Sequence, residues 1–125
     1  MKKLETLSLD IVVPLWNDKE VVPLLCKTIF SELEHKFKSL RLILVDDGSR
    51  DGTFECAMKM RGDFSYVEVI RLAGNFGQHR AILAGLRSTD ADIVGVMDSD
   101  LQDRPEQIPI LVEKMLEEDT PMVIA

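Results

Sequence analysis

Residues 41–49, Arg-Leu-Ile-Leu-Val-Asp-Asp-Gly-Ser, contain the pattern that decides the fold. The apolar run 42–45 is typical of a strand that is buried on both faces of a sheet. Two aspartates and a glycine then end the strand, and residues from Thr53 to about Arg61 can form a helix. This stretch therefore predicts a strand, an acidic turn and a helix in succession.

The same alternation of strand and helix continues on both sides of this stretch. Apolar patterns predict further strands at 9–15, 66–72, 92–97 and 121–125, and further helices at about 19–37, after the turn 74–77, and from Pro105 onward. The alternating pattern of 66–72 indicates a half-exposed edge strand. Pro109 has to lie near the first turn of the last helix or kink that helix.

Strands of this kind, separated by helices, predict an α/β fold. We expect a Rossmann-like, doubly wound and mostly parallel sheet with helices on both faces. Right-handed crossovers place the first strand centrally, between the second and the fourth. Residues 1–125 are expected to form a single domain, and because the chain stops on a strand, that domain is expected to be a truncated part of a longer protein.

Composition narrows the class of protein. The chain has 125 residues, of which 46% are hydrophobic and 30% charged, as in an ordinary soluble domain. Its net charge of −7 argues against nucleic acid as a partner and gives no indication of a polybasic membrane-docking surface. No apolar run approaches the ~20 residues of a membrane span, and no signal peptide is recognisable. We expect a cytoplasmic location, or the cytoplasmic face of the membrane for a longer protein.

The two cysteines, Cys26 and Cys56, lack the spacing of a zinc site or a redox pair. Both fall on stretches that are expected to be helical. We interpret them as small buried hydrophobic residues in a reducing compartment.

Carboxylates follow two of the predicted strands. Asp46 and Asp47 end the second strand, and Asp98 and Asp100 follow the fourth. Open parallel sheets bind ligands at the carboxyl ends of their strands, so these groups should share one edge. Two carboxylates about 4 Å apart repel by ~4 kcal/mol at an effective dielectric near 20. A divalent cation between them replaces this repulsion with attraction, and oxygen ligands suit Mg²⁺ or Mn²⁺.

The geometry expected for this metal site is simple. In an extended segment, Asp98 and Asp100 lie on the same side, and Gln102 continues the series with a neutral oxygen.

Several of these residues have a structural alternative. Aspartates at strand-to-helix junctions also cap helices and form turns, and Asp51 and Asp103 suit either role. Asp46 is expected to bond to backbone amides of the neighbouring loop rather than to a ligand. Trp16 can stack on a planar base or cover the edge of the core. His79 is expected at a surface or capping position.

Four segments together resemble glycosyltransferase family 2, whose catalytic domain has the GT-A fold. The resemblance is closest to the polyprenyl-phosphate sugar transferases, such as dolichyl-phosphate mannose synthase and the bacterial aminoarabinose transferases. The segments that carry it are 12–17, 44–53, 75–79 and 97–106.

The resemblance implies a nucleotide-sugar site and assigns roles to its residues. Asp47 would accept a hydrogen bond from the base, and Asp98 and Asp100 would be the catalytic residues. The metal would be held by Asp98, Asp100 and Gln102. The residues that would bind the nucleotide sugar are Pro14, Trp16, Asn17, Asp18, Asp47, Asn75, Gln78, Asp98 and Ser99.

This chain departs from the family pattern at two positions. Gly74 stands where the family often has arginine, which removes a positive contact to the donor. Asp18 stands where glutamate is more usual, which is a milder change.

The expected function is inverting sugar transfer from a nucleoside diphosphate sugar, with UDP favoured over GDP, to a polyprenyl phosphate. The second pKa of a phosphate is about 6, so a lipid phosphate is already ionised near neutral pH and needs no general base. Two alternatives stay open: a nucleotide- and metal-binding module without turnover, and a nucleotidyltransferase-like enzyme. An unpaired edge strand also allows an oligomer.

Overall fold

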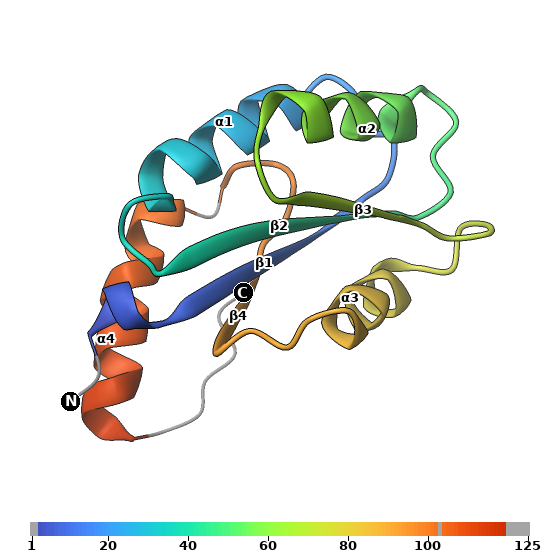
Figure 1. Ribbon diagram of the computed structural model, residues 1–125. Helices are drawn as coiled ribbons and strands as arrows, with labels where there is room; N and C mark the ends of the chain where they lie inside the picture. Colours follow the sequence, from blue (N-terminus) through green and yellow to red (C-terminus); the bar gives the residue numbers. More distant parts are fainter. Residues whose placement is uncertain (1–2, 103, 120–125) are drawn as a thin grey trace.

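In the part of the chain that the structure describes, a four-stranded, all-parallel sheet forms the centre (Figure 1). The structure is a computed structural model that describes residues 3–102 and 104–119. The strands are β1 (Ser8–Leu15), β2 (Ser39–Asp46), β3 (Val67–Arg71) and β4 (Ile93–Val96). Their order, β3-β2-β1-β4, confirms that the first strand is central and that the third lies at an edge. Because β2 and β4 lie on opposite sides of β1, the carboxyl ends of these strands border a crevice.

Helices cover both faces of the sheet, as expected for a doubly wound fold (Figure 1). α1 (Val22–Leu33) and α2 (Thr53–Asp63) lie on one face, and α3 (Gln78–Arg87) lies on the other. A 3₁₀ turn at Pro105–Gln107 leads into α4 (Ile108–Glu118), which contacts the N-terminal 3₁₀ turn Leu4–Thr6. Within the described parts of the chain, none of the helices has the length and apolar character needed to span a bilayer.

The core has two parts, one on each side of the sheet. Alternate side chains of β2 show the division: Leu42 and Leu44 belong to the large cluster with α1, while Ile43 and Val45 belong to the smaller cluster beneath α3. All four are fully buried. The continuous apolar run of this strand therefore serves two faces, as its sequence predicts.

The two cysteines are free and lie on α1 and α2. Cys26 is buried and Cys56 is half-buried. Burial, followed by the nearby Cys56, raises the pKa of Cys26 to about 12, so this thiol is protonated at neutral pH. The prediction of a small hydrophobic role is confirmed for Cys26.

Some predicted boundaries were wrong. The helix expected at 19–37 is only Val22–Leu33, because a turn precedes it and residues 34–38 form turns and a bend that lead into β2. Pro23 lies in its first turn, where proline is tolerated. Pro109 likewise lies in the first turn of α4 and causes no kink there. The strand expected at 121–125 lies outside the described residues.

Candidate functional site

The loop after β1 forms one wall of the site. The backbone N–H of Trp16 donates to Asp18 Oδ2 at 2.8 Å. The backbone N–H groups of Asn17 and Asp18 donate to Ser49 Oγ at 2.8 Å and Thr53 Oγ1 at 2.9 Å. Asn17 adopts a φ of 53°, in the left-handed region that asparagine tolerates. These bonds tie the loop to the turn after β2, while the Trp16 side chain stays 54% exposed.

Asp46 ends β2 and has a structural role. It is fully buried, and its Oδ1 accepts a hydrogen bond from the Ser49 N–H at 3.3 Å. Among the described residues, its Oδ2 has no hydrogen-bond partner. The expectation that Asp46 bonds to the neighbouring loop is confirmed. Asp51 also acts as a turn former, because it accepts from both the N–H and the hydroxyl of Thr53 at the start of α2.

Asp47 holds the loop that leads into α3. Its side chain is almost completely buried, and its two oxygens accept from the N–H groups of Phe76 at 2.8 Å and Gly77 at 3.0 Å. Gly48 beside it has a φ of 79°, and a Cβ there would lie 2.6 Å from the carbonyl carbon of Gly74. The turn after β2 and the turn before α3 are therefore in direct contact. Hydrogen bonding of Asp47 to a base stays a prediction.

The segment after β4 places two carboxylates at the same edge of the sheet. Asp98 Oδ1 accepts from the amide Nε2 of Gln78, the first residue of α3, at 2.9 Å. Asp100 Oδ1 accepts from the N–H of Gln102 at 3.1 Å. The expectation of an extended segment was wrong: residues 99 and 100 lie in a turn, and Leu101 has a φ of 62°. The Asp100 carboxylate bonds to the backbone two residues on, which favours a turn over a strand.

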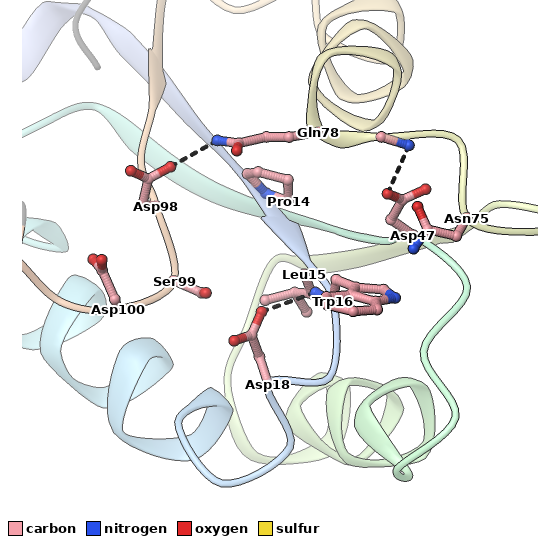
Figure 2. A pocket seen from close by; sticks show the side chains of 11 residues that line it. Pro14, Leu15, Trp16, Asp18, Asp47, Asn75, Gln78, Asp98, Ser99 and Asp100 are labelled. Atoms are coloured by element: carbon pink, nitrogen blue, oxygen red, sulfur yellow. Dashed lines mark hydrogen bonds between the residues drawn. The ribbon is translucent and has the colours of Figure 1, made fainter.

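The carboxyl ends of β1, β2 and β4 border a cavity of about 410 Å³ (Figure 2). Most of the residues predicted for nucleotide and metal binding are brought together here. Figure 2 shows Trp16 on one side of it and Asp98 and Asp100 on the other. The lining residues are Pro14, Leu15, Trp16, Asp18, Asp47, Asn75, Gly77, Gln78, Asp98, Ser99 and Asp100.

Two predicted site residues lie elsewhere. Asn17 does not line this cavity but faces a neighbouring one of about 710 Å³, where its Oδ1 accepts from the Arg50 N–H at 3.1 Å. Gln102 is exposed and does not line the 410 Å³ cavity. The turn at residues 99 and 100 breaks the alternation on which its placement beside Asp98 and Asp100 was based.

Sequence reasoning missed the neighbouring cavity itself. Arg50 and Arg71 line it together with Trp16, which it shares with the first cavity. Arg71 is the last residue of edge strand β3, and its guanidinium carbon lies 4.4 Å from the centre of the Phe54 ring. A surface position at the end of an edge strand carries no signal that marks it as part of a cavity.

The carboxylates of the cavity suit a metal ion that also binds to a ligand. Within residues 3–102 and 104–119, no three His, Cys, Asp or Glu side chains are grouped so that they could hold a metal ion by themselves. Asp98 and Asp100 supply two carboxylates to the cavity. Mg²⁺ and its close analogues usually take only one or two protein carboxylates and complete their coordination with water and substrate phosphates. The residues present therefore fit a metal–diphosphate complex.

Comparison with known proteins shows the family to which the chain belongs. The model of Glycosyl transferase family 2 matches residues 10–125. The undecaprenyl-phosphate 4-deoxy-4-formamido-L-arabinose transferase of Pseudomonas syringae pv. syringae (strain B728a) is 38% identical over 118 residues, which cover 90% of this chain and 34% of that protein. The chain thus spans about a third of the length of the curated relatives it matches.

Solved structures share the fold. A mannosyltransferase from Pyrobaculum calidifontis, in complex with GDP-Man and Mn²⁺, superposes with a TM-score of 0.78 at 18% identity, over 88% of this chain and 32% of that one. S. aureus TarS in complex with UDP-GlcNAc gives a TM-score of 0.72 at 21% identity, over 89% and 31%. These likenesses confirm the predicted Rossmann-like GT-A architecture. With the family match over nearly its whole length, the chain belongs to glycosyltransferase family 2.

Proposed function

We propose that this chain is the donor-binding part of a glycosyltransferase that moves a sugar from a nucleoside diphosphate sugar to a polyprenyl phosphate, with the help of a divalent metal. The observation that carries the proposal is the cavity at the carboxyl ends of β1, β2 and β4. The cavity is lined by the exposed indole of Trp16, by the loop after β1, and by the carboxylates of Asp98 and Asp100, which follow β4. The indole matches the base, and the two carboxylates match the metal-bound diphosphate of such a donor.

The placement of these groups suggests how the donor lies. Trp16 and Asp98 lie on opposite sides of the cavity (Figure 2). An indole stacks well on a planar base, so the nucleoside belongs beside Trp16. The diphosphate then extends toward Asp98 and Asp100 on the other side of the cavity.

Asp98 and Asp100 would hold Mg²⁺ or Mn²⁺. When bound, the metal neutralises the charge that develops on the leaving nucleoside diphosphate. Gln78 acts on Asp98 through its amide, because the 2.9 Å hydrogen bond orients one oxygen of that carboxylate. A hydrogen bond of this kind to a metal ligand usually affects metal affinity.

The acceptor is proposed from the names of the relatives and from acid–base chemistry. The curated relatives carry names that specify undecaprenyl phosphate. A phosphate monoester, with a second pKa of about 6, is largely dianionic near neutral pH. Its oxygen can therefore attack the sugar carbon from the side opposite the diphosphate without a general base. The bond from that carbon to the diphosphate breaks as the new bond forms, so the nucleoside diphosphate leaves and the configuration is inverted. We favour UDP over GDP as the nucleotide.

Asp100→Ala provides the first test. Calorimetry should show that UDP binds the unaltered chain more tightly with Mn²⁺ than without it. Asp100→Ala should lose this metal-dependent part, by about tenfold or more, which equals ~1.4 kcal/mol. Asp63→Ala, which removes an exposed carboxylate at the end of α2, is the matched control and should bind as the unaltered chain does. If Asp100→Ala kept the same Mn²⁺ dependence, the metal role would be wrong.

A transfer assay tests turnover. A UDP-sugar and undecaprenyl phosphate are offered to this chain and to a longer protein that contains it. Because the chain spans about a third of its relatives, a module that binds the donor without transferring it is the second candidate. Binding by both proteins with transfer by the longer one alone identifies the chain as a donor module. Donor binding without transfer by either contradicts the proposed activity.

A further inference from the structure

α3 carries an unusual surface on the side that points away from the sheet. Ala81 and Gly85 are buried against β1 and β2, so positions half a helical turn away face outward. Three large apolar side chains lie on that outward side or in the loop before it, and their exposed fractions are 51%, 46% and 38% for Phe76, Leu83 and Leu86. We define the α3 outer face as Phe76, His79, Arg80, Leu83, Leu86 and Arg87, all of which are exposed.

The charge of this region is opposite to that of the molecule. Between Glu68 and Asp90 the sequence has three arginines and no aspartate or glutamate, although the whole chain has a net charge of −7. In residues 3–102 and 104–119, neither Arg80 nor Arg87 forms a salt bridge with a carboxylate. The net charge of the whole chain does not indicate this surface, because it averages over a segment whose charge has the opposite sign.

The outward side of α3 combines the kinds of side chain that helices at a membrane surface use. The outward side of a helix in a soluble domain is normally polar. Here Leu83 lies opposite the buried stripe, with Leu86 and His79 on one side of it and Arg80 and Arg87 on the other. Helices that lie in a membrane surface combine apolar groups with flanking arginines in this way, and aromatic residues such as Phe76 add to their binding.

The α3 outer face is continuous with the donor cavity. Gly77 and Gln78, at the start of α3, line the cavity, and Gln78 bonds to Asp98 inside it (Figure 2). A surface that contacts the α3 outer face would therefore lie beside the cavity rim. We propose that the α3 outer face docks the protein onto an anionic lipid surface, with Leu83, Leu86 and Phe76 entering the headgroup layer and both arginines contacting lipid phosphates. This rests on the proposed function, because a polyprenyl phosphate is held in such a surface.

Flotation with vesicles tests the charge component. The chain is mixed with vesicles of phosphatidylcholine alone or of equal parts phosphatidylcholine and phosphatidylglycerol. It should float with the second kind and much less with the first. Each basic residue near an anionic surface contributes ~1 kcal/mol, which is about fivefold in affinity, so Arg80→Gln with Arg87→Gln should weaken binding by roughly 25-fold. Lys59→Gln with Arg61→Gln removes the same charge from α2, on the other face of the sheet, and should change binding little.

A second pair of variants tests the contribution of the apolar side chains to vesicle binding. Leu83→Ser should weaken vesicle binding by about three- to tenfold, since a half-exposed leucine would lose its burial among the headgroups. Leu24→Ser on α1 changes a leucine on the other face that is somewhat more exposed, 55% against 46%, and should leave vesicle binding unchanged. All these side chains are exposed, so their substitution should leave the fold intact. Thermal unfolding of the variants at the same temperature as the unaltered chain checks this.

UDP binding in the presence of Mn²⁺, measured on the same variants, separates this proposal from the proposed function. Unchanged UDP affinity together with lost vesicle binding supports docking through the α3 outer face. Vesicle binding that depends on Arg80 and Arg87 without any UDP binding leaves docking in place and contradicts the donor site.

Equal flotation with both kinds of vesicle, or equal flotation of the Arg80/Arg87 variant and the unaltered chain, overturns the docking proposal. Self-association that Leu83→Ser abolishes, without vesicle binding, also overturns it, because the occupant is then a second copy.

Discussion

Trp16 and Asp47 line the same cavity, but their surroundings give them different roles. The Trp16 side chain is half exposed, and its backbone is held by Asp18, so the indole is available to a ligand. Asp47 is 4% exposed, and each of its oxygens already accepts a backbone N–H. Substitution of Trp16 should therefore affect binding directly, whereas substitution of Asp47 should affect stability first.

Trp16→Ala should weaken UDP binding by roughly tenfold or more, because stacking of a base on an aromatic ring contributes ~1–3 kcal/mol. Binding of inorganic diphosphate with Mn²⁺ should not change, since it has no base. Calorimetry with both ligands makes the comparison, and Trp16→Phe, which keeps a ring, should retain most of the UDP affinity. Equal losses for UDP and diphosphate would remove Trp16 from the base site.

Asp47→Ala should lower the free energy of unfolding by about 1–3 kcal/mol, because the N–H groups of Phe76 and Gly77 lose a charged acceptor. Asp47→Asn keeps one acceptor oxygen and should lose less. Denaturation in urea measures both variants. An Asp47→Ala variant as stable as the unaltered chain would show that these two bonds do not hold the loop before α3.

At the scale of elements, the position of α3 depends on how closely it approaches the sheet. Gly85 provides that approach, since a Cβ at this position would lie 2.4 Å from Val12 Cγ1 and 3.2 Å from Val45 Cγ2. Both valines belong to the small core cluster beneath α3. The approach matters for the site, because the same helix places Gln78 against Asp98.

Gly85→Ala should destabilise the protein by about 1–2 kcal/mol, because an overpacking cost of roughly 2–3 kcal/mol against β1 and β2 outweighs the ~1 kcal/mol gain in helix propensity. Gly62→Ala on α2 is the control, since a Cβ there meets nothing within 4 Å. That variant should be more stable by about 0.5–1 kcal/mol. Thermal unfolding of the two variants should therefore shift in opposite directions; a shift of both toward higher stability would contradict the close packing of α3.

At the scale of the whole molecule, the two ends of the sheet have different roles: one borders the candidate site and the other contributes to stability. The carboxyl ends of the strands border the cavity. At the amino end, Arg41 contacts Asp10 at 2.6 Å and Glu68 at 2.7 Å, and donates to the carbonyl of Ser88 at 3.0 Å. The hydrogen bond to Asp10 is the largest cause of the raised pKa of Arg41. This network joins β1, β2, β3 and the end of α3 without touching the site.

Asp10→Ala should therefore reduce stability without altering UDP affinity. Asp10 is almost fully buried while Arg41 is partly exposed, so the loss should be about 2–3 kcal/mol, less than for a fully buried pair. Urea denaturation and calorimetry on the same sample measure the two effects. A fall in UDP affinity at temperatures where the variant is fully folded would show that the two ends of the sheet are coupled.

The local pattern of apolar and polar residues was sufficient to predict the strands of this molecule and their order in the sheet. The apolar runs at 9–15 and 42–45, each followed by polar turn residues, specify strands because burial on two faces requires continuous apolar side chains. The handedness of crossovers then determines the central place of β1, and parallel strands bring Asp47 and Asp98 to one edge. The edge that carries the site therefore follows from the sequence alone.

The roles of individual side chains at that edge required the tertiary structure. The backbone amides that Asp47 contacts belong to a loop that is 29 residues away from it in the sequence. The cavity beside Arg50 and Arg71 likewise arises from segments that meet only after folding, and the packing of α3 against the sheet decides which side of that helix faces outward. Sequence periodicity reports which face of an element is buried, whereas the contacts of a loop depend on how the elements that hold it are packed.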